Sequence, residues 1–225
     1  MYLWSMNNVP TNLSQYNNSW FKPGGNFISR ALWYRLSSVF VNSRFPFSGF
    51  KIFLLRLFGA KIGNGVVIKP NVNIKYPWNL EVGDYSWIGE HAWIDNLVAV
   101  KIGSNCCISQ GGFLLTGNHD YTKPTFDLIV KQIVLEDGSW VGAKAIVCPG
   151  VTMKSHSILS VGSVATSDLD AWAIYQGNPA VKVKDRQSKV EWYSLILFNQ
   201  FQFFVSFVAF VRINDSVTSL AVRYE

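Results

Sequence analysis

The chain has little charge and no concentrated block of it. Only 15% of its 225 residues are Asp, Glu, Lys or Arg, whereas 49% are hydrophobic. This composition excludes an intrinsically disordered protein, which combines high charge with low hydrophobicity. The net charge of +6 favours an anionic partner such as a nucleotide cofactor, an acidic polymer or a membrane surface. Because the basic residues are scattered and no nucleic-acid-binding motif is present, we expect no nucleic-acid partner.

Cysteine is also scarce. Cys106, Cys107 and Cys148 cannot all pair, and none of them has the CxxC spacing of a metal site. Unpaired cysteines fit the reducing cytoplasm. Cys106 and Cys107 lie side by side in a strand-like repeat, which favours a packing role, although a nucleophilic role stays open.

The first twenty residues lack the basic start and apolar stretch of a signal peptide. Residues 192–213 are about long enough to span a bilayer, which takes ~20 mostly apolar residues. Polar residues interrupt this stretch, so we interpret it as a docked or interfacial element. The sequence therefore predicts a cytoplasmic protein, with contact to the inner face of the membrane as an open alternative.

What the chain does have is a repeat of period six. Gly often follows the repeated aliphatic residue, and a small or β-branched residue stands four positions after it. Two-residue shifts occur at Leu80-Glu81 and Val100-Lys101. The aliphatic positions are Ile62, Ile68, Ile74, Leu80, Val82, Ile88, Ile94, Val100, Ile102, Ile108, Leu114, Leu135, Val141, Val147, Met153, Leu159 and Ala165.

Period six fits neither a helix, with period 3.6, nor an exposed strand, with period 2. It is typical of short strands joined by tight corners, where glycine tolerates backbone conformations that a Cβ would obstruct. Three hexads form one triangular coil of about 18 residues, and stacked coils pair their strands in parallel at ~4.8 Å. The alternative is an α/β or sandwich protein rich in Val, Ile and Gly, which the number of periodic positions disfavours.

The sequence thus predicts a mainly β fold, a single-stranded parallel β-helix, in three parts. Residues 1–60 form an N-terminal helical or irregular cap, residues 61–170 the β-helix with a loop at 116–132, and residues 171–225 a C-terminal extension. Within the cap, residues 27–58 read as two helices broken at 46–49. Their mixture of basic and apolar residues is typical of helices that cover the end of a solenoid, or of an amphipathic surface that rests on a membrane.

The single interruption of the repeat contains Asn118-His119-Asp120, followed by Tyr121 and Phe126. A loop that leaves a rigid scaffold is a frequent place for function. A neutral histidine is well suited near pH 7 to take a proton from a hydroxyl group. His119 is therefore the candidate catalytic base.

Three further motifs complete a pattern that resembles the hexapeptide-repeat acyltransferases. They are Ser139-Trp140-Val141-Gly142, Pro149-Gly150-Val151-Thr152 and Gly177-Asn178-Pro179-Ala180. More narrowly, residues 17–34, 69–97 and 108–129 resemble the colanic acid biosynthesis acetyltransferases of exopolysaccharide clusters. The resemblance covers about residues 12 to 186.

This resemblance implies a left-handed β-helix, since periodicity alone does not give the hand, and a homotrimer with active sites in the clefts between subunits. It implies acetyl-CoA as co-substrate, a sugar or lipid-linked saccharide as acceptor, and no metal. His119 falls on the family's catalytic histidine. The acetyl group would pass directly to a sugar hydroxyl in a ternary complex, with an O-acetyltransferase function in exopolysaccharide or surface-glycan synthesis.

The remaining site residues follow from the same resemblance and from their neighbourhood to His119. Asp95 and Asn96 are expected to hold the acceptor, with a role as corner residues as the alternative, and Asn118 and Tyr121 flank the base. Val181 stands where relatives often have arginine, so phosphate contact would rest on two lysines as point charges. The expected coenzyme-binding residues are Trp140, Gly142, Ala143, Val161, Thr166, Ser167, Lys182 and Lys184, with the Ala143 N–H as oxyanion donor.

Two other functions remain as alternatives. The chain could be a non-catalytic scaffold, which the intact loop disfavours. The γ-type carbonic anhydrases share the prism, but they hold zinc with histidines, two of them about five residues apart. Five residues after His119 the chain has Pro124, which disfavours this alternative.

Overall fold

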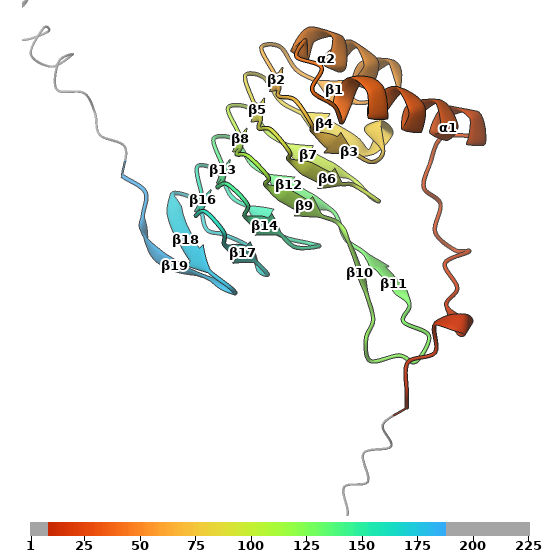
Figure 1. Ribbon diagram of the computed structural model, residues 1–225. Helices are drawn as coiled ribbons and strands as arrows, with labels where there is room; N and C mark the ends of the chain where they lie inside the picture. The colour runs from red at the N-terminus through yellow and green to blue at the C-terminus, as the bar shows by residue number, and fades with distance from the viewer. Residues whose placement is uncertain (1–8, 188–225) are drawn as a thin grey trace, which may run out of the picture. The chain divides into compact units, whose positions relative to one another are not determined.

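The structure is a computed structural model that describes residues 9–187. A short 3-10 turn, η1 (Leu13–Gln15), precedes two helices, and short strands follow, with a second 3-10 turn, η3 (Pro77–Asn79), among them. The strands assemble into three parallel sheets that form the walls of a β-helix (Figure 1). The mainly β solenoid predicted from the period of six is confirmed.

Each wall is a stack of strands taken from successive coils. The first sheet contains β1 (Lys61–Ile62), β4 (Leu80–Val82), β7 (Val100–Ile102), β12 (Ile133–Leu135) and β15 (Thr152–Met153). The second contains β2 (Val67–Ile68), β5 (Trp87–Ile88), β8 (Cys107–Ile108), β13 (Trp140–Val141), β16 (Ile158–Leu159), β18 (Ala173–Gly177) and β19 (Ala180–Asp185). The third contains β3 (Asn73–Ile74), β6 (Trp93–Asp95), β9 (Phe113–Leu115), β14 (Ile146–Val147) and β17 (Val164–Ala165).

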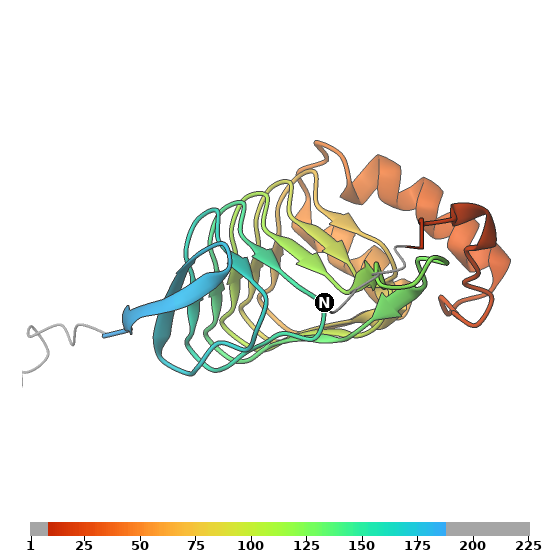
Figure 2. The same cartoon turned by 90° about the horizontal axis from the view of Figure 1, so that it is seen from below.

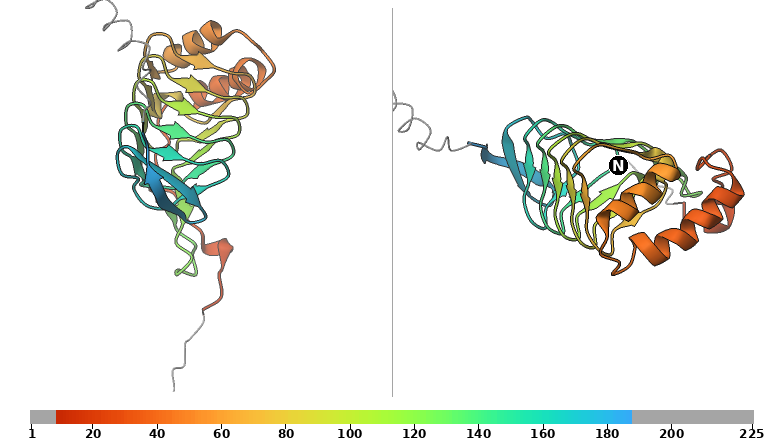
Figure 3. Two further views of the ribbon diagram at one scale, coloured as in Figure 1. Left: turned by 90° about the vertical axis from the view of Figure 1, so that its left-hand side faces the viewer. Right: turned by 90° about the horizontal axis from the view of Figure 1, so that it is seen from above.

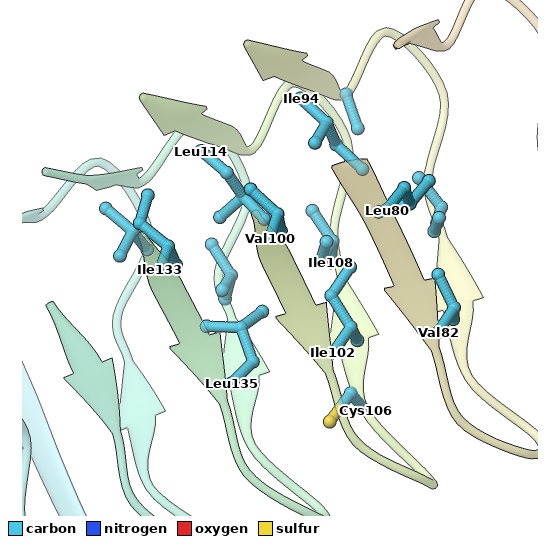
Figure 4. Close-up of a cluster of buried hydrophobic side chains, with 14 of the residues drawn as sticks. Leu80, Val82, Ile94, Val100, Ile102, Cys106, Ile108, Leu114, Ile133 and Leu135 are labelled. Atoms are coloured by element: carbon cyan, nitrogen blue, oxygen red, sulfur yellow. The ribbon is translucent and has the colours of Figure 1, made fainter. Parts of the chain in front are cut away.

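The register of the strands matches the aliphatic repeat. Ile62 lies opposite Val82, so the first coil takes 20 residues, as the neighbouring pair Asn64 and Asp84 shows. Leu135 lies opposite Met153, so this coil is two residues shorter than the first. The later coils lack the two-residue shift. All seventeen aliphatic positions of the repeat are buried. Figure 4 shows members of this ladder, among them Leu80, Ile94 and Ile108, pointing into the space between the sheets.

The glycine beside each aliphatic residue is required for a different reason from the one predicted from the sequence. At Gly83 the backbone φ is not in the positive region, but an added Cβ would lie 2.6 Å from the backbone of Gly103 and Ser104 in the next coil. At Gly142 a Cβ would lie 2.6 Å from the Val161 nitrogen. The hexad glycine is therefore needed for close stacking of coils, not for an unusual backbone angle.

Two helices cover one end of the prism, as predicted for residues 27–58. Helix α1 (Phe27–Leu36) is capped by Asn26, whose side chain accepts a bond from the Ser29 N–H at 2.8 Å. A π-helical turn, η2 (Ser37–Val41), ends it, and α2 (Ser48–Leu57) begins inside the expected break at 46–49. Figure 3 shows both helices at the end where β1 to β3 lie.

Buried polar bonds fix these helices to the first coil. Trp33 is buried, and its indole N–H donates to the Ile74 carbonyl at 3.0 Å. The ammonium group of Lys51 is fully buried and donates to the Lys69 carbonyl at 2.7 Å. Burial lowers the pKa of Lys51. Ser48 accepts the Ile68 N–H at 2.8 Å, so α2 is joined to β2.

The prism continues beyond the expected boundary at residue 170. Strand β18 pairs in parallel with β16, and Tyr175 is buried in the same ladder as Leu159. Strand β19 then folds back antiparallel onto β18. Figure 2 shows these two strands at the opposite end from the helices. The apolar stretch at 192–213 and most of the predicted extension lie outside the described residues.

The predicted loop at 116–132 is a hairpin of β10 (Gly117–His119) and β11 (Leu128–Val130). The two strands pair antiparallel, with His119 opposite Leu128. The segment before α1 runs beside the tip of this hairpin (Figures 1 and 3), and the Asn12 N–H donates to the Pro124 carbonyl at 2.8 Å. Among the described helices none is long and apolar enough to cross a membrane.

The stacking role of the hexad glycines can be tested with one pair of variants. Gly83→Ala forces a Cβ into the backbone of the neighbouring coil, and overpacking of this kind costs about 1–3 kcal/mol. Gly49→Ala is the matched control, because nothing lies within 4 Å of the Cβ it would add. Thermal unfolding should show a lower Tm for Gly83→Ala and an equal or higher Tm for Gly49→Ala. Equal Tm values for Gly83→Ala and the wild type would contradict the stacking argument.

Candidate active site

The ring of His119 is held in one orientation by the hairpin that carries it. Its Nδ1 lies 2.9 Å from the Phe126 carbonyl oxygen. Because a carbonyl can only accept a hydrogen bond, Nδ1 carries the ring proton, and Nε2 of the neutral imidazole keeps a free lone pair. The ring also stacks on Phe126, with centroids 4.4 Å apart and planes inclined by 7°. The hairpin therefore presents the histidine as a proton acceptor.

Phe126 reaches this position through the turn at the hairpin tip. Its backbone has a φ of +52°, and its N–H donates to the Lys123 carbonyl at 3.0 Å. Two carboxylates fix the turn. Asp120 accepts the Thr122 hydroxyl at 2.5 Å, and Asp127 accepts the Thr125 hydroxyl at 2.6 Å. These hydroxyl bonds lower the pKa values of both carboxyl groups, so the turn keeps its bonds until the pH falls below their ordinary range.

The segment before α1 forms the opposite wall. Tyr16 approaches His119, with 5.6 Å between ring centroids. The segment is fixed to the first coil at Trp78, whose indole N–H donates to the Pro23 carbonyl at 2.6 Å. Gly24 has a φ of +74°, and a Cβ there would lie 2.6 Å from the Trp78 nitrogen. Only glycine meets both demands at this position.

Between these walls lies a cleft of about 740 Å³. Its floor contains Asp95, whose carboxylate is almost fully buried and lies 2.8 Å from the ammonium of Lys75. A paired carboxylate and ammonium in a partly enclosed cleft can bind hydroxyl groups in fixed directions. The lining residues are Tyr16, Asn18, Ser19, Phe21, Pro23, Lys75, Tyr76, Asp95, Leu97, Leu115, Gly117, Asn118, His119 and Leu128.

A second cavity of about 560 Å³ adjoins this cleft beneath α1. The two share Lys75, Tyr76 and Asp95. Its other walls include the aromatic rings of Trp33, Tyr34, Trp78 and Trp93. The cleft of His119 and the aromatic cavity are therefore separated by these three shared residues.

The predicted acceptor residues divide into two groups. Asp95 and Asn118 line the cleft together with His119. Asn96 does not, because it is fully buried and its amide bonds the Tyr76 backbone at 3.0 Å and 2.6 Å. Asn96 thus makes the contacts expected of a corner residue, the alternative given for it. Tyr121 is 83% exposed at the hairpin tip and also lies outside the cleft.

The predicted coenzyme residues lie elsewhere on the prism, and none of them lines the cleft of His119. Trp140 is on the outer face of the second sheet, where its indole N–H donates to the Ser109 hydroxyl at 2.8 Å. Ala143 and Val161 stand on stacked corners, joined by the Gly162 N–H and the Ala143 carbonyl at 2.9 Å. Thr166 and Ser167 are exposed after β17. Lys182 and Lys184 project from β19, and Lys182 pairs with Asp185 at 2.8 Å.

Several cleft residues were not predicted individually from sequence. Tyr16, Asn18 and Phe21 come from the N-terminal segment, and Lys75 comes from the end of β3. The signal was present for most of them, because residues 17–34 and 69–97 carry the narrower family resemblance. Sequence could not show that the segment before α1 returns to the hairpin, a contact between residues more than a hundred positions apart.

The other reactive side chains do not join this site. Cys106 is buried in the core, where burial raises the pKa of its thiol. His91 stands at a corner beside Asn71, and the ring of His156 packs against Trp172 with 4.1 Å between centroids. Within residues 9–187 there is no group of three His, Cys, Asp or Glu residues that could hold a metal ion.

Comparison with known proteins gives the class to which this architecture belongs. The "putative colanic acid biosynthesis acetyltransferase WcaF" of Escherichia coli is 38% identical over 164 residues, which cover 72% of this chain and 90% of that protein. A hexapeptide-repeat-containing acetyltransferase from Vibrio cholerae, solved with acetyl-coenzyme A, superposes with a TM-score of 0.65 at 21% identity and covers 72% of this chain and 88% of its own. A galactoside acetyltransferase in complex with coenzyme A has a TM-score of 0.64 at 20% identity and covers 71% and 82%. No family model matches the chain.

The prism with its single histidine hairpin defines a β-helical acyltransferase. The chain belongs to the hexapeptide-repeat acetyltransferases, on the evidence of its 38% identity to the Escherichia coli relative. It is an acetyl-CoA-dependent acetyltransferase.

The orientation of His119 predicts one tautomer. Nitrogen NMR on protein labelled at histidine should show a protonated Nδ1 and a bare Nε2 for His119 at a pH where the ring is neutral. Phe126→Gly removes the stacking ring while the carbonyl remains, so the variant should keep the same tautomer with a more mobile ring. A protonated Nε2 in the wild type would contradict the arrangement.

Proposed function

We propose that this enzyme transfers the acetyl group of acetyl-CoA to a hydroxyl group of a sugar, with His119 as general base, in the synthesis of an exopolysaccharide or surface glycan. The observation that carries the proposal is the Nδ1 bond of His119 to a carbonyl, which leaves Nε2 free inside a cleft with a paired carboxylate and ammonium. The name of the Escherichia coli relative supports the polysaccharide context. The acceptor sugar is either free or lipid-linked.

In the proposed reaction the acceptor hydroxyl lies between Asp95 and His119. Nε2 takes the hydroxyl proton while the oxygen attacks the thioester carbonyl carbon, and a tetrahedral oxyanion forms. The carbon–sulfur bond then breaks, and the proton on Nε2 passes to the departing thiolate. The products are the O-acetyl sugar and free coenzyme A, and no acyl-enzyme is formed.

The oxyanion needs a donor that is already in place. The Ala143 N–H is suited to this role, because it donates no hydrogen bond to any residue in the described part of the chain and stands on a corner fixed by the Gly162 bond. A backbone donor of this kind stabilises charge without reorganising. Ala143 does not line the cleft of its own His119, so the donor and the base of one site come from two copies of the chain.

This separation supports a homotrimer with the active sites between subunits. The outer face of the second sheet exposes large apolar rings at Trp87 and Trp140. The outer face of the first sheet instead exposes Lys61 and Lys101 and carries Glu81. A trimer that buries the aromatic faces would bring the stacked corners of one copy to the histidine hairpin of the next. Cytoplasmic acetyl-CoA would then enter along these corners, with no metal required.

The role of His119 predicts a large loss of turnover on substitution. His119→Ala should lower the turnover number by about 10²–10⁴-fold, the usual contribution of a general base. His91→Asn is the matched control, since His91 has a φ of +59°, which asparagine tolerates, and lies outside the cleft. Thiol release from acetyl-CoA with a sugar acceptor measures both variants, and circular dichroism checks the fold. Near-normal turnover in folded His119→Ala would refute the proposed mechanism.

The lysines of β19 predict a graded effect on coenzyme affinity. Lys184→Gln should raise the Kd for coenzyme A about fivefold, the effect of losing one exposed charge pair. Lys182→Gln should have a smaller effect, because Asp185 already neutralises that ammonium. Lys154→Gln, another exposed lysine paired with an aspartate, is the control. Calorimetric titration gives the three values, and an unchanged Kd in the Lys182, Lys184 double variant would exclude both as phosphate ligands.

A further inference from the structure

The outer side of helix α2 exposes a row of large apolar side chains. Phe47, Phe53 and Leu57 are 66%, 57% and 65% exposed, and Phe50 lies between them at 39%. Their spacing of three or four residues places Phe50, Phe53 and Leu57 on one side of the helix. We call these four residues the phenylalanine face. A contiguous exposed apolar surface of this kind marks an interaction site.

The phenylalanine face is held in shape before any partner arrives. The ring of Phe50 packs against Phe40 and Phe45, with centroids 5.1 Å and 5.6 Å apart. Phe45 also packs against Phe47 at 5.3 Å, in the connection between the two helices. Helix α2 itself is anchored to the prism by buried Leu54, Leu55 and Lys51 on its other side. The exposed rings therefore stand on a fixed support.

Helix α1 and the turn after it also expose large apolar side chains. Phe27, Ile28, Leu32 and Val39 are all more than half exposed. Between the apolar residues stand the exposed arginines Arg35 and Arg44. Neither helix has an acidic residue in its first turn. The cap therefore exposes both apolar and cationic groups.

The charge of the cap has one sign only. The chain has 14 acidic residues, and all of them follow position 80, with Glu81 the first. Residues 1–80 contain nine of the 20 lysines and arginines. A second copy of this cap would bring like charges together, which disfavours a cap-to-cap contact. The matching occupant is an apolar surface with negative charge at its edge.

We propose that the helical cap docks on the surface of an anionic lipid bilayer, with the phenylalanine face in the lipid and Arg35 and Arg44 at the headgroups. Amphipathic helices bind membranes in this way, through buried apolar area together with attraction to anionic lipid. The cap needs no spanning segment for this contact.

The position of the docked cap also indicates the class of acceptor, and this part of the inference rests on the proposed function. The aromatic cavity beneath α1 shares Lys75, Tyr76 and Asp95 with the cleft of His119. A saccharide that is attached to a lipid would lie beside α1 when the cap is on the bilayer. Its sugar would enter the cleft through the aromatic cavity while its lipid stays in the membrane. A lipid-linked saccharide is therefore the acceptor class that fits the docked enzyme.

Vesicle binding by the full-length protein tests the docking. The probe is a set of vesicles of phosphatidylcholine alone or mixed with phosphatidylglycerol, and bound protein is measured by co-sedimentation at low and high salt. We expect binding to the mixed vesicles that weakens with salt. Phe47→Ser with Phe53→Ser should lower the partition at least about tenfold, and Arg44→Gln about fivefold. Val181→Ser with Val183→Ser, at the far end of the prism, is the matched control and should bind normally.

Three results would overturn the docking proposal. They are no vesicle binding by the wild type, full binding by the phenylalanine variant, and a phenylalanine variant that loses its oligomeric state in light scattering. The last result would assign the face to a contact between copies. Acetyl transfer to a soluble sugar is measured on the phenylalanine variant and on Arg44→Gln and should be unchanged, because Phe47, Phe53 and Arg44 do not line the cleft. If the wild-type enzyme transfers no acetyl group to the sugar, the proposed function is refuted, whereas the conclusion on vesicle binding is unaffected.

Discussion

The structure depends on how closely one coil of the backbone lies against the next. Parallel strands pair across the coils through short bonds, such as the Gly83 N–H to the Ile102 carbonyl at 2.8 Å, and the corners between them leave no room for a Cβ. This close stacking fixes the aliphatic residues into inward ladders and makes the prism stiff. It also means that an insertion can leave the prism only where it does not disturb a corner. The histidine hairpin leaves between β9 and β12, and the stack closes behind it, with Leu135 opposite Ile102.

Because the hairpin starts from a fixed wall, the position of His119 is determined by few contacts. The Phe126 carbonyl sets the tautomer, and the N-terminal segment closes the cleft from the other side through Tyr16 and Trp78. His119 and the paired Asp95 and Lys75 therefore belong to one chain. The corners expected to hold the coenzyme do not line this cleft, so a second copy of the chain would complete the proposed site. The cap adds a second surface whose charge and exposed rings match a lipid bilayer.

Much of the fold was predictable because a six-residue period leaves a trace at every coil. Each aliphatic position of the repeat is buried, and both helices of the cap form where the sequence indicated them. The position of His119 outside the regular coils was predictable because it stands in the one break of the repeat, and its catalytic role stays a prediction. The burial of Asn96 and the end of the prism were not predictable. The amide of Asn96 bonds a backbone in a neighbouring coil, and β18 joins the second sheet after an irregular stretch, so neither feature has a local sequence signal. The hand of the helix came from the family resemblance alone.

In the proposed enzyme, the cleft between the hairpin and the N-terminal segment holds the acceptor against Nε2 of His119. A crystal structure with coenzyme A and an acceptor saccharide would show this contact. We expect a sugar hydroxyl within hydrogen-bond distance of Nε2, with Asp95 in contact with the same sugar and the coenzyme thiol reaching them from the corners of a neighbouring copy. A saccharide bound on another face of the prism, or a coenzyme whose sulfur lies far from His119, would refute this arrangement.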